Sequence, residues 1–366
     1  MGQSPKSDFY NSNGDGLPFL QGNRTFGDKY PTFDTWTTFV TKEAEVGDVI
    51  MSVRAPVGDI NITPIRMCLG RGVCGLRHKQ GAQEFLYYLL RANKENLINR
   101  ENGTVFGSIN KTDISNLEVQ VPSLREQIQI GLTLKAIDDK IENNKKINHH
   151  LVEQAYAIYK EVCVNQKDDS FVEETIKSIS QKVITGKTPS TKNKDYYGGD
   201  LPFITIPDMH NNIYCVETLR YLTKKGEQTQ PSKTLPKNSI IVSCIATPGL
   251  VSLLDRESQT NQQINAVIPL ENQEYYLFLE LLSKSKLIIE LGSSGSTTYN
   301  LNKTQFEKIK ISAPSIKKRY ELNNLLRPLF LKINQTQHET IKLSQLRDTL
   351  LPKLLSGEIS VNQATK

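Results

Sequence analysis

Two long stretches of the sequence carry apolar residues that recur at alternating steps of three and four. The apolar positions are Ile137, Ile141, Leu151 and Ile158 in the first stretch and Leu329, Ile333, Leu343 and Leu350 in the second. This spacing is that of heptad positions a and d, so it predicts two long helices that pair as a coiled coil. Polar residues interrupt both series at matching positions, Asn144 and Asn148 in one and Thr336 and Thr340 in the other. Polar residues at such positions lower stability and select the register.

The second series follows the first at a displacement of 192 residues. If a local two-fold axis relates the two halves of the chain, the helices run antiparallel. A helix of about 40 residues is on the order of 60 Å long at 1.5 Å per residue, which is long enough to hold two globular heads apart. The alternative is that each helix packs on its own head as an ordinary amphipathic helix.

The rest of the chain also occurs twice. GQSP (2–5) matches GKTP (186–189), and VIMSVRAPVG (49–58) resembles IIVSCIATPG (240–249). SINKTDISNLEVQVPS, which precedes the first long helix, resembles NLNKTQFEKIKISAPS, which precedes the second. A repeat of this length indicates a duplicated domain, because solenoid repeats are only about 20 to 50 residues long.

Each copy mixes strand and helix signals. Val- and Ile-rich runs such as 48–53 and 239–245 predict strands, and apolar residues at helical spacing predict one helix in each copy. We therefore expect a mixed α/β fold (α+β), with two pseudo-repeated heads separated by a long antiparallel two-helix coiled coil. The expected segments are a first head (1–122), a first long helix (123–166), a second head (167–314) and a second long helix (315–366).

Composition excludes some classes of protein. The mean hydropathy is −0.42, and no apolar run approaches the roughly 20 residues that a membrane helix needs. The N-terminal sequence lacks the basic and apolar regions of a secretory signal. We therefore expect a cytoplasmic protein without a membrane partner. The net charge of +6 permits nucleic-acid binding but does not establish it.

The sequence carries no recognisable catalytic or metal-binding motif. Its five cysteines are odd in number and scattered, which argues against a disulfide framework and a zinc site. A P-loop, a dinucleotide-binding glycine motif and a nucleophile elbow are all missing. Ser52 and Asp59 resemble a nucleophile and a carboxylate, but a strand end followed by a turn explains them equally well. We expect no catalytic residue, no metal ligand and no bound cofactor.

Taken in order, the motifs resemble the specificity subunit of type I restriction-modification systems. The resemblance rests on the two glycine-containing openings, GDVIMSVRAPVGDI, GSINKTDISNLEVQVPSLREQ and the ending LRDTLLPKLLSGEI, and it covers nearly the whole chain. It implies that the heads are target recognition domains for double-stranded DNA, each reading half of a bipartite site. It also implies that the helices dock two methyltransferase subunits, which restriction and translocase subunits join. S-adenosylmethionine, ATP and Mg²⁺ would then bind to those partners, which would methylate and cleave DNA.

Comparison of the two copies indicates which residues are the better candidates for DNA contacts. Loops that follow matched motifs but differ between the heads are expected to carry specificity, such as 21–24 against 205–208 and Arg54 against Ile245. The Gly-rich loops 103–111 and 295–303 end in a paired lysine that suits a phosphate contact. For each candidate, a plain turn or solvated surface is the competing interpretation. The candidates are Gln21, Asn23, Arg24, Lys29, Arg54 and Lys111 in the first head and Lys187, Thr205, Asp208, His210 and Lys303 in the second.

The two copies differ at their starts. Residues 170–184 precede the glycine motif of the second head and have no counterpart before Gly2. Either the start is truncated or the first head closes without this piece. Two rival functions remain open at this point: a target-reading module of a fused restriction-methyltransferase, and a coiled-coil scaffold whose heads bind proteins instead of DNA.

Overall fold

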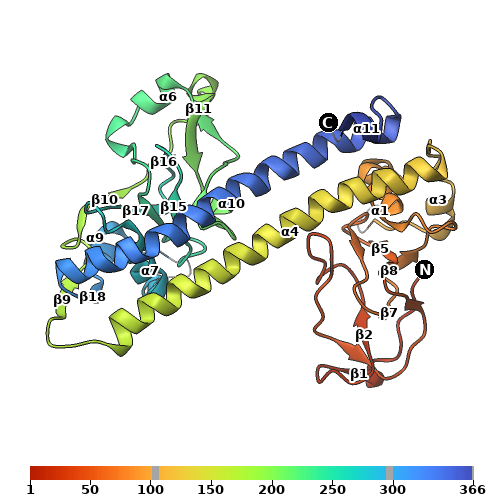
Figure 1. The fold of residues 1–366 in the computed structure, drawn as a ribbon, viewed down its shortest axis with the longest axis horizontal. Helices are drawn as coiled ribbons and strands as arrows, with labels where there is room; N and C mark the ends of the chain where they lie inside the picture. Colours follow the sequence, from red (N-terminus) through yellow and green to blue (C-terminus); the bar gives the residue numbers. More distant parts are fainter. Residues whose placement is uncertain (101–106, 294–299, 365–366) are drawn as a thin grey trace. The chain divides into compact units, whose positions relative to one another are not determined.

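A computed structural model describes residues 1–100, 107–293 and 300–364 (Figure 1). The chain divides into two compact units, of which unit 1 contains Met1–Ile141 and Lys342–Lys366 and unit 2 contains Glu142–Ile341. Each unit therefore combines one head with a part of both long helices. This grouping differs from the four consecutive segments expected from the sequence. Each long helix is divided between the two units, and each part of it packs within the unit to which it belongs.

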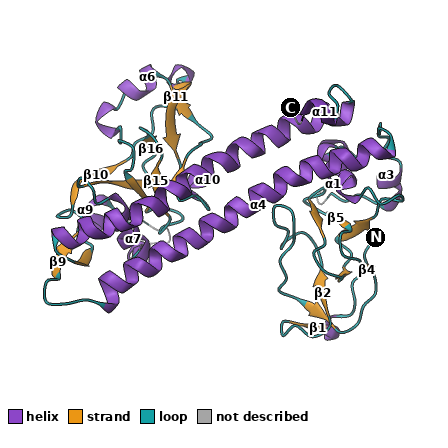
Figure 2. Ribbon diagram, in the orientation of Figure 1, coloured by secondary structure: helices purple, strands orange, loops and turns teal. Residues whose placement is uncertain are grey.

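The two long helices are α4 (Leu124–Lys160), of 37 residues, and α10 (Ile316–Ser356), of 41 residues (Figure 2). Both agree with the expected length of about 40 residues. All eight apolar seam positions predicted from the heptads, from Ile137 to Leu350, are buried or half-buried. The heptad periodicity thus correctly identified the buried face of each helix.

Within unit 2 the helices run antiparallel. The Asn144 Nδ2 atom donates to Glu339 Oε2 at 2.9 Å, and the Thr336 hydroxyl donates to Asn148 Oδ1. Asn148 comes after Asn144 along α4, whereas its partner Thr336 comes before Glu339 along α10. The two helices therefore run in opposite directions, which confirms the predicted direction for this unit. Thr340 does not cross the seam, because its hydroxyl donates to the Thr336 carbonyl at 2.8 Å in its own helix.

Within unit 1 the same helices share a core with the first head. Ile130 and Leu134 of α4 lie in one apolar cluster with Leu350 and Leu354 of α10 and with Phe85 of α1 (Gln83–Ala92). The helices therefore pair with each other and also pack on a head. The two alternatives posed from the sequence are both realised.

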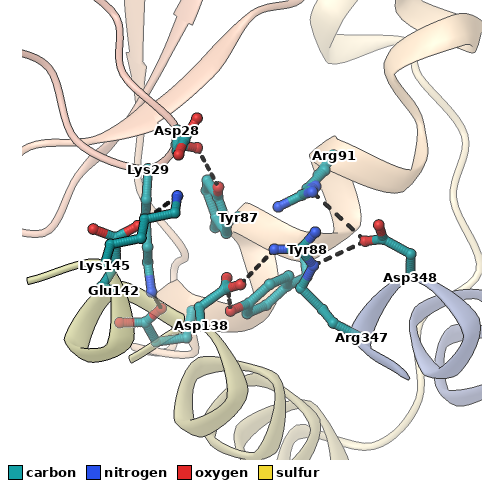
Figure 3. A network of polar contacts seen from close by, with 11 residues as sticks. Asp28, Lys29, Tyr87, Tyr88, Arg91, Asp138, Glu142, Lys145, Arg347 and Asp348 are labelled. Atoms are coloured by element: carbon teal, nitrogen blue, oxygen red, sulfur yellow. Dashed lines mark hydrogen bonds and ion pairs between the residues drawn. The ribbon is translucent and has the colours of Figure 1, made fainter. Parts of the chain in front are cut away.

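A buried charge network joins these elements in unit 1 (Figure 3). The Asp138 carboxylate accepts from the Tyr88 hydroxyl at 2.5 Å and from Arg347 Nη1 at 2.7 Å. Burial alone would lower the pKa of Arg347, but hydrogen bonds to Asp348 and Asp138 outweigh it and raise that pKa. The guanidinium therefore stays charged at a seam position that a coiled coil usually gives to an apolar residue.

Among the described residues, the strands of the first head form two sheets. One sheet has the order β1 (Tyr10–Asn11), β3 (Trp36–Thr37), β2 (Leu17–Leu20), β7 (Met67–Leu69) and β4 (Glu43–Ala44). The other has the order β6 (Ile60–Ile62), β5 (Val49–Ser52) and β8 (Val73–Leu76). The remaining helices of unit 1 are α2 (Lys94–Ile98), α3 (Lys111–Ser115) and α11 (Val361–Ala364).

The described strands of the second head form three sheets. Their orders are β10 (Ser180–Thr185), β17 (Ile264–Pro269), β14 (Ile240–Ser243), β15 (Val251–Leu254), β12 (Tyr214–Cys215); β13 (Tyr221–Leu222), β11 (Tyr197–Ile204), β16 (Gln259–Thr260); and β18 (Lys310–Ala313), β9 (Val172–Thr175). Its helices are α5 (Ile206–Met209), α6 (Lys224–Gln228), α7 (Glu274–Ser283), α8 (Ser285–Ser293) and α9 (Lys303–Glu307). Mixed α/β heads with two long helices confirm the predicted fold class.

The strand registers confirm the duplication. β2 and β7 are parallel, as are β11 and β16, while β5 and β8 are antiparallel, as are β14 and β17. Matching positions pair in both heads: Phe19 with Cys68 and Val49 with Leu76 in the first, and Phe203 with Gln259 and Ile240 with Val267 in the second. The sequence repeat is therefore a repeat of backbone pairing.

The central strand of each head is buried along its whole length because both of its faces are covered. Side chains alternate between the faces of a strand. Val49 and Met51 of β5 belong to the core shared with α1, whereas Ile50 belongs to a second cluster on the other face. Ile240 and Ile241 of β14 divide between two clusters in the same way.

The five cysteines are all free and buried, which confirms the interpretation of them as core thiols. No helix in the described part of the chain is long and apolar enough to cross a membrane.

Candidate nucleic-acid interface

The shared glycine of GQSP and GKTP fixes the backbone at the start of each head. A Cβ atom added to Gly186 would lie 2.1 Å from the Asn261 carbonyl oxygen, and one added to Gly2 would lie 2.2 Å from the Gly70 oxygen. No side chain fits at such a distance. The Gly186 N–H donates to the Ile264 carbonyl at 3.1 Å, which holds the adjoining Lys187 in place.

A group of four lysines, here called the lysine cluster, gathers on the second head. Its members are Lys182 of β10, Lys187 after it, Lys233 in the short helix Pro231–Lys233 and Lys303 at the start of α9. Burial lowers the pKa of Lys233, and the charges of Lys303, Lys187 and Lys182 lower it further. The other three ammonium groups thus repel that of Lys233, and an anion such as a DNA phosphate would relieve that repulsion.

Structural contacts hold the lysine cluster in position. The Lys233 ammonium donates to the Thr185 carbonyl at 2.9 Å, which ties it to the end of β10. Lys303 is exposed and lies 3.4 Å from Glu307 one turn further along α9. Two lysines predicted as DNA contacts, Lys187 and Lys303, are therefore brought together with two others.

The repeated Asn-Lys-Thr sequence is a helix start. The Asn110 carboxamide accepts from the Thr112 N–H at 2.7 Å and caps α3, while Asn302 accepts from the Gln305 N–H at 3.0 Å and caps α9. Lys111 and Lys303 are the first residues of these helices and are exposed. Residues 101–106 and 294–299 of the Gly-rich loops lie outside the described residues, so their proposed phosphate contacts stay a prediction.

The first head presents three candidates around one pocket. Gln21, Asn23 and Arg24 line a cavity of about 450 Å³ together with Tyr10 and Thr35. All three have a polar partner: the Ser4 hydroxyl donates to Gln21 Oε1, Asn23 Nδ2 donates to Asp59 Oδ2, and Arg24 pairs with Asp34, which also lines the cavity. Arg24 and Asp34 are both exposed, so water screens their attraction and DNA could displace Asp34.

The corresponding segment of the second head is a helix instead of a turn. Thr205 caps α5, and the Asp208 carboxylate accepts from the Thr205 N–H at 2.7 Å and from the Leu219 N–H at 3.0 Å. The expected difference between the heads at this place is therefore a difference in backbone as well as in side chains. His210, at the end of α5, is exposed.

Two of the predicted DNA contacts point inward. Asp208 is 6% exposed because it caps its own helix, and Lys29 is 4% exposed with its ammonium 3.7 Å from the Glu84 carboxylate. A side chain buried in this way cannot reach a base edge in the structure as it stands. Lys29 and Asp208 are therefore given no role in a base contact below, and their predicted contact with DNA stays a prediction.

The shared serine at the end of each central strand braces the turn that follows. The Ser52 hydroxyl donates to the Pro56 carbonyl at 2.8 Å and accepts from the Asp59 N–H at 2.9 Å. Ser243 makes the same two bonds, to the Thr247 carbonyl and from the Leu250 N–H. This confirms the turn interpretation of Ser52. The exposed Arg54 follows it and pairs through its backbone with Ser108, close to Lys111.

Sequence reasoning missed Lys182 and Lys233. Candidates were ranked by comparing matched positions, and Lys182 lies in the segment that has no counterpart in the first head. The signal that could have found both is the local excess of lysine, with Lys182 and Lys187 close to the glycine motif and Lys233 before the central strand.

These features define a duplicated DNA-recognition protein, and comparison with known families agrees. The profile of the type I restriction modification DNA specificity domain matches residues 2–153 and 169–343. The chain therefore belongs to the family of type I restriction-modification specificity subunits. Such subunits bind DNA, assemble with other subunits and are not themselves catalytic. The scaffold without DNA binding is not favoured.

Individual relatives support this assignment. The chain is 32% identical over 354 residues to the type I restriction enzyme HindI specificity subunit of Haemophilus influenzae, covering 75% of this chain and 77% of that one. It is 42% identical over 148 residues to the putative MjaX specificity subunit of Methanocaldococcus jannaschii, covering 40% and 35%. The crystal structure of a type I S subunit from M. genitalium has the same fold, with a TM-score of 0.66, 18% identity and coverage of 96% and 92%.

Proposed function

We propose that each head reads a different half of a bipartite DNA target. The observation that carries this proposal is the combination of one strand register with two unlike surfaces. The heads share backbone pairing at matched positions, yet residues 21–24 form a turn and residues 205–208 start a helix. Two heads with one scaffold and different surfaces suit two unlike half-sites on the same duplex.

Phosphate contacts and base contacts fall to different residues in this proposal. The lysine cluster of the second head and Lys111 of the first bind backbone phosphates, which fixes the position of the protein without reading sequence. Gln21, Asn23, Arg24 and Arg54 of the first head carry base-reading donors, and Thr205 and His210 take this role in the second.

We also propose that the long helices dock two methyltransferase subunits. Apolar side chains remain exposed near the start of each helix, namely Ile128 (42%) and Leu132 (57%) on α4 and Tyr320 (39%) and Leu325 (55%) on α10. Ile128 and Tyr320 occupy the same position of the repeat. Equivalent apolar surface in each unit suits two copies of one partner. S-adenosylmethionine, ATP and Mg²⁺ would bind to the partners and their associated nuclease subunits.

Methylome sequencing tests the bipartite proposal. The chain is expressed with its methyltransferase subunit in cells that lack other modification systems. Two short half-sites around a fixed gap are expected. A continuous motif, or one half-site repeated as a palindrome, would refute two independently reading heads.

A gel shift at two salt concentrations separately tests the alternative function, a coiled-coil scaffold whose heads bind proteins instead of DNA. DNA affinity that falls as salt rises is expected from phosphate contacts, because each contact releases condensed counterions. Binding that is absent, or indifferent to salt, would instead favour heads that bind proteins.

A further inference from the structure

One leucine of the second head is strongly exposed at a loop position. Leu219 lies between β12 and β13 and is 81% exposed, more than any other large apolar side chain in the described part of the chain. Its apolar surface stays in water, so it contributes little to the stability of the head. Loop residues that a rigid scaffold holds in place are frequent binding residues.

Hydrogen bonds fix the backbone on both sides of Leu219. The Thr218 hydroxyl donates to the Phe203 carbonyl at 3.0 Å, and the Phe203 N–H donates to the Arg220 carbonyl at 3.0 Å. The Leu219 N–H itself donates to Asp208 Oδ1 at 3.0 Å. Because the turn is tied to both β11 and α5, it holds the leucine at one place on the surface of the head.

The Asp208 carboxylate also joins this turn to a candidate base contact. Its second oxygen, Oδ2, accepts from the Thr205 N–H and from the Thr205 hydroxyl, each at 2.7 Å. One carboxylate thus bonds the backbone at Thr205 and the backbone at Leu219. Leu219 therefore lies beside the start of α5, the helix at whose end the exposed His210 is found.

The matched position of the first head also lies among candidate base contacts. β2 pairs with β3 in the same register in which β11 pairs with β13, so Asp34 corresponds to Leu219. Asp34 lines the first-head cavity together with Gln21 and Arg24, and its carboxylate lies 2.7 Å from Arg24 Nη1. The same place in the two heads thus carries a charged pair in one and an exposed leucine in the other.

The chemistry of the base edges limits what an exposed leucine can recognise. In the major groove the bases present hydrogen-bond donors and acceptors and one apolar group, the C5-methyl of thymine. The minor groove presents only polar groups on its base edges. The Leu219 side chain has no donor or acceptor, so among the base edges only the thymine methyl offers it a favourable contact.

We propose that Leu219 contacts the C5-methyl group of a thymine in the half-site that the second head reads. This inference rests on the proposed function and adds to it the chemistry of one base contact. Cytosine at that position would place a polar amino group, and no methyl group, next to the leucine. The contact therefore selects thymine without a hydrogen bond.

Deoxyuridine tests the proposal, because it keeps the hydrogen-bonding groups of thymine and lacks only the methyl. The full chain, assembled with its methyltransferase subunit, is titrated with duplexes in which each thymine of the two half-sites is replaced in turn. We expect replacement at one position to weaken binding about fourfold, as loss of one buried methyl contact implies. Leu219→Ala should weaken binding to the thymine duplex by at least about that factor. It should also bind the thymine and deoxyuridine duplexes equally.

A matched variant separates this contact from a general effect of surface apolar residues. Val172→Ala shortens another exposed aliphatic side chain of the second head, on β9, which lies at the other end of that head from β11 (Figure 1). This variant should distinguish thymine from deoxyuridine as well as the unaltered chain does.

The proposal is overturned if a sequence-specific complex forms and no deoxyuridine replacement weakens it, or if Leu219→Ala keeps the discrimination. Half-sites that contain no thymine would overturn it as well. Each of these outcomes leaves the reading of two half-sites standing. A chain that prefers no DNA sequence would instead overturn the proposed function, and this inference with it.

Discussion

The two heads show which parts of a duplicated domain are constrained and which are free. Both keep a glycine against a neighbouring carbonyl, a serine that braces a turn and an asparagine that caps a helix. All three residues satisfy backbone geometry. The surfaces differ, with a polar pocket at Gln21 and Arg24 in the first head and the lysine cluster in the second. The backbone contacts preserve the scaffold, and the surface is available for different DNA sequences.

The attachment of α4 to each head makes a second comparison. In unit 1 the Tyr88 hydroxyl of α1 donates to Asp138 of α4, whereas in unit 2 Tyr159 of α4 donates to Glu280 of α7. Burial raises the pKa of both tyrosines, and the carboxylates raise it further. Both phenols therefore stay protonated as donors. The two units use the same kind of bond with donor and acceptor exchanged, but only Asp138 also receives a half-buried arginine, Arg347.

The largest predicted effect follows from that arginine. Arg347→Met leaves the Asp138 carboxylate buried without its cation, which should destabilise unit 1 by about 3–5 kcal/mol. Hydrogen exchange should become faster in α1 and remain unchanged in α7. Lys342→Met, at an exposed position of the same helix, is the matched control and should change neither. Equal loss of protection in α1 and α7 would show that the units do not respond separately.

The lysine cluster gives the next effect. Replacing Lys187, Lys233 and Lys303 with Gln should weaken binding to any DNA sequence by at least about tenfold at low salt, since phosphate contacts do not depend on sequence. The slope of log affinity against log salt should fall by roughly 0.9 for each lost contact. Titrations at several salt concentrations measure both. Lys225→Gln, beside Asp195 on the same head, is the control. An unchanged slope would remove the cluster from the interface.

The smallest effect concerns Glu280. Burial raises the pKa of Glu280, so the folded chain binds its proton more readily than the unfolded chain. Its contribution to stability is therefore present below the unfolded pKa and is lost as pH rises through the folded pKa. Glu280→Gln keeps an acceptor for Tyr159 and should reduce the pH dependence of unit 2 above about pH 4.3, the ordinary Glu value. Urea unfolding across pH 4 to 8 checks this, and an unaltered pH profile would contradict it.

The sequence predicted what depends on local spacing. The heptad spacing located the seam residues, and the repeated motifs located the matched strands. Both could be predicted because helical periodicity, and residues required by a particular backbone geometry, are visible in the sequence itself. Burial of Lys29 could not be predicted, since its ammonium lies beside Glu84, which is distant in sequence. Asp208 is buried because it caps its own helix and also accepts from the Leu219 N–H. Lys233 joins Lys187 and Lys303 only through tertiary folding.

The central claim is that the two heads read separate half-sites, and the methylome of a variant tests it most directly. Gln21→Ala with Arg24→Ala changes two side chains of the first-head pocket that are exposed and lie away from the helices. The variant chain is expressed with its methyltransferase subunit and compared with the unaltered chain. We predict that one half-site becomes degenerate or is lost, while the sequence of the other half-site stays the same. A change in both half-sites together, or no change in either, would contradict the account.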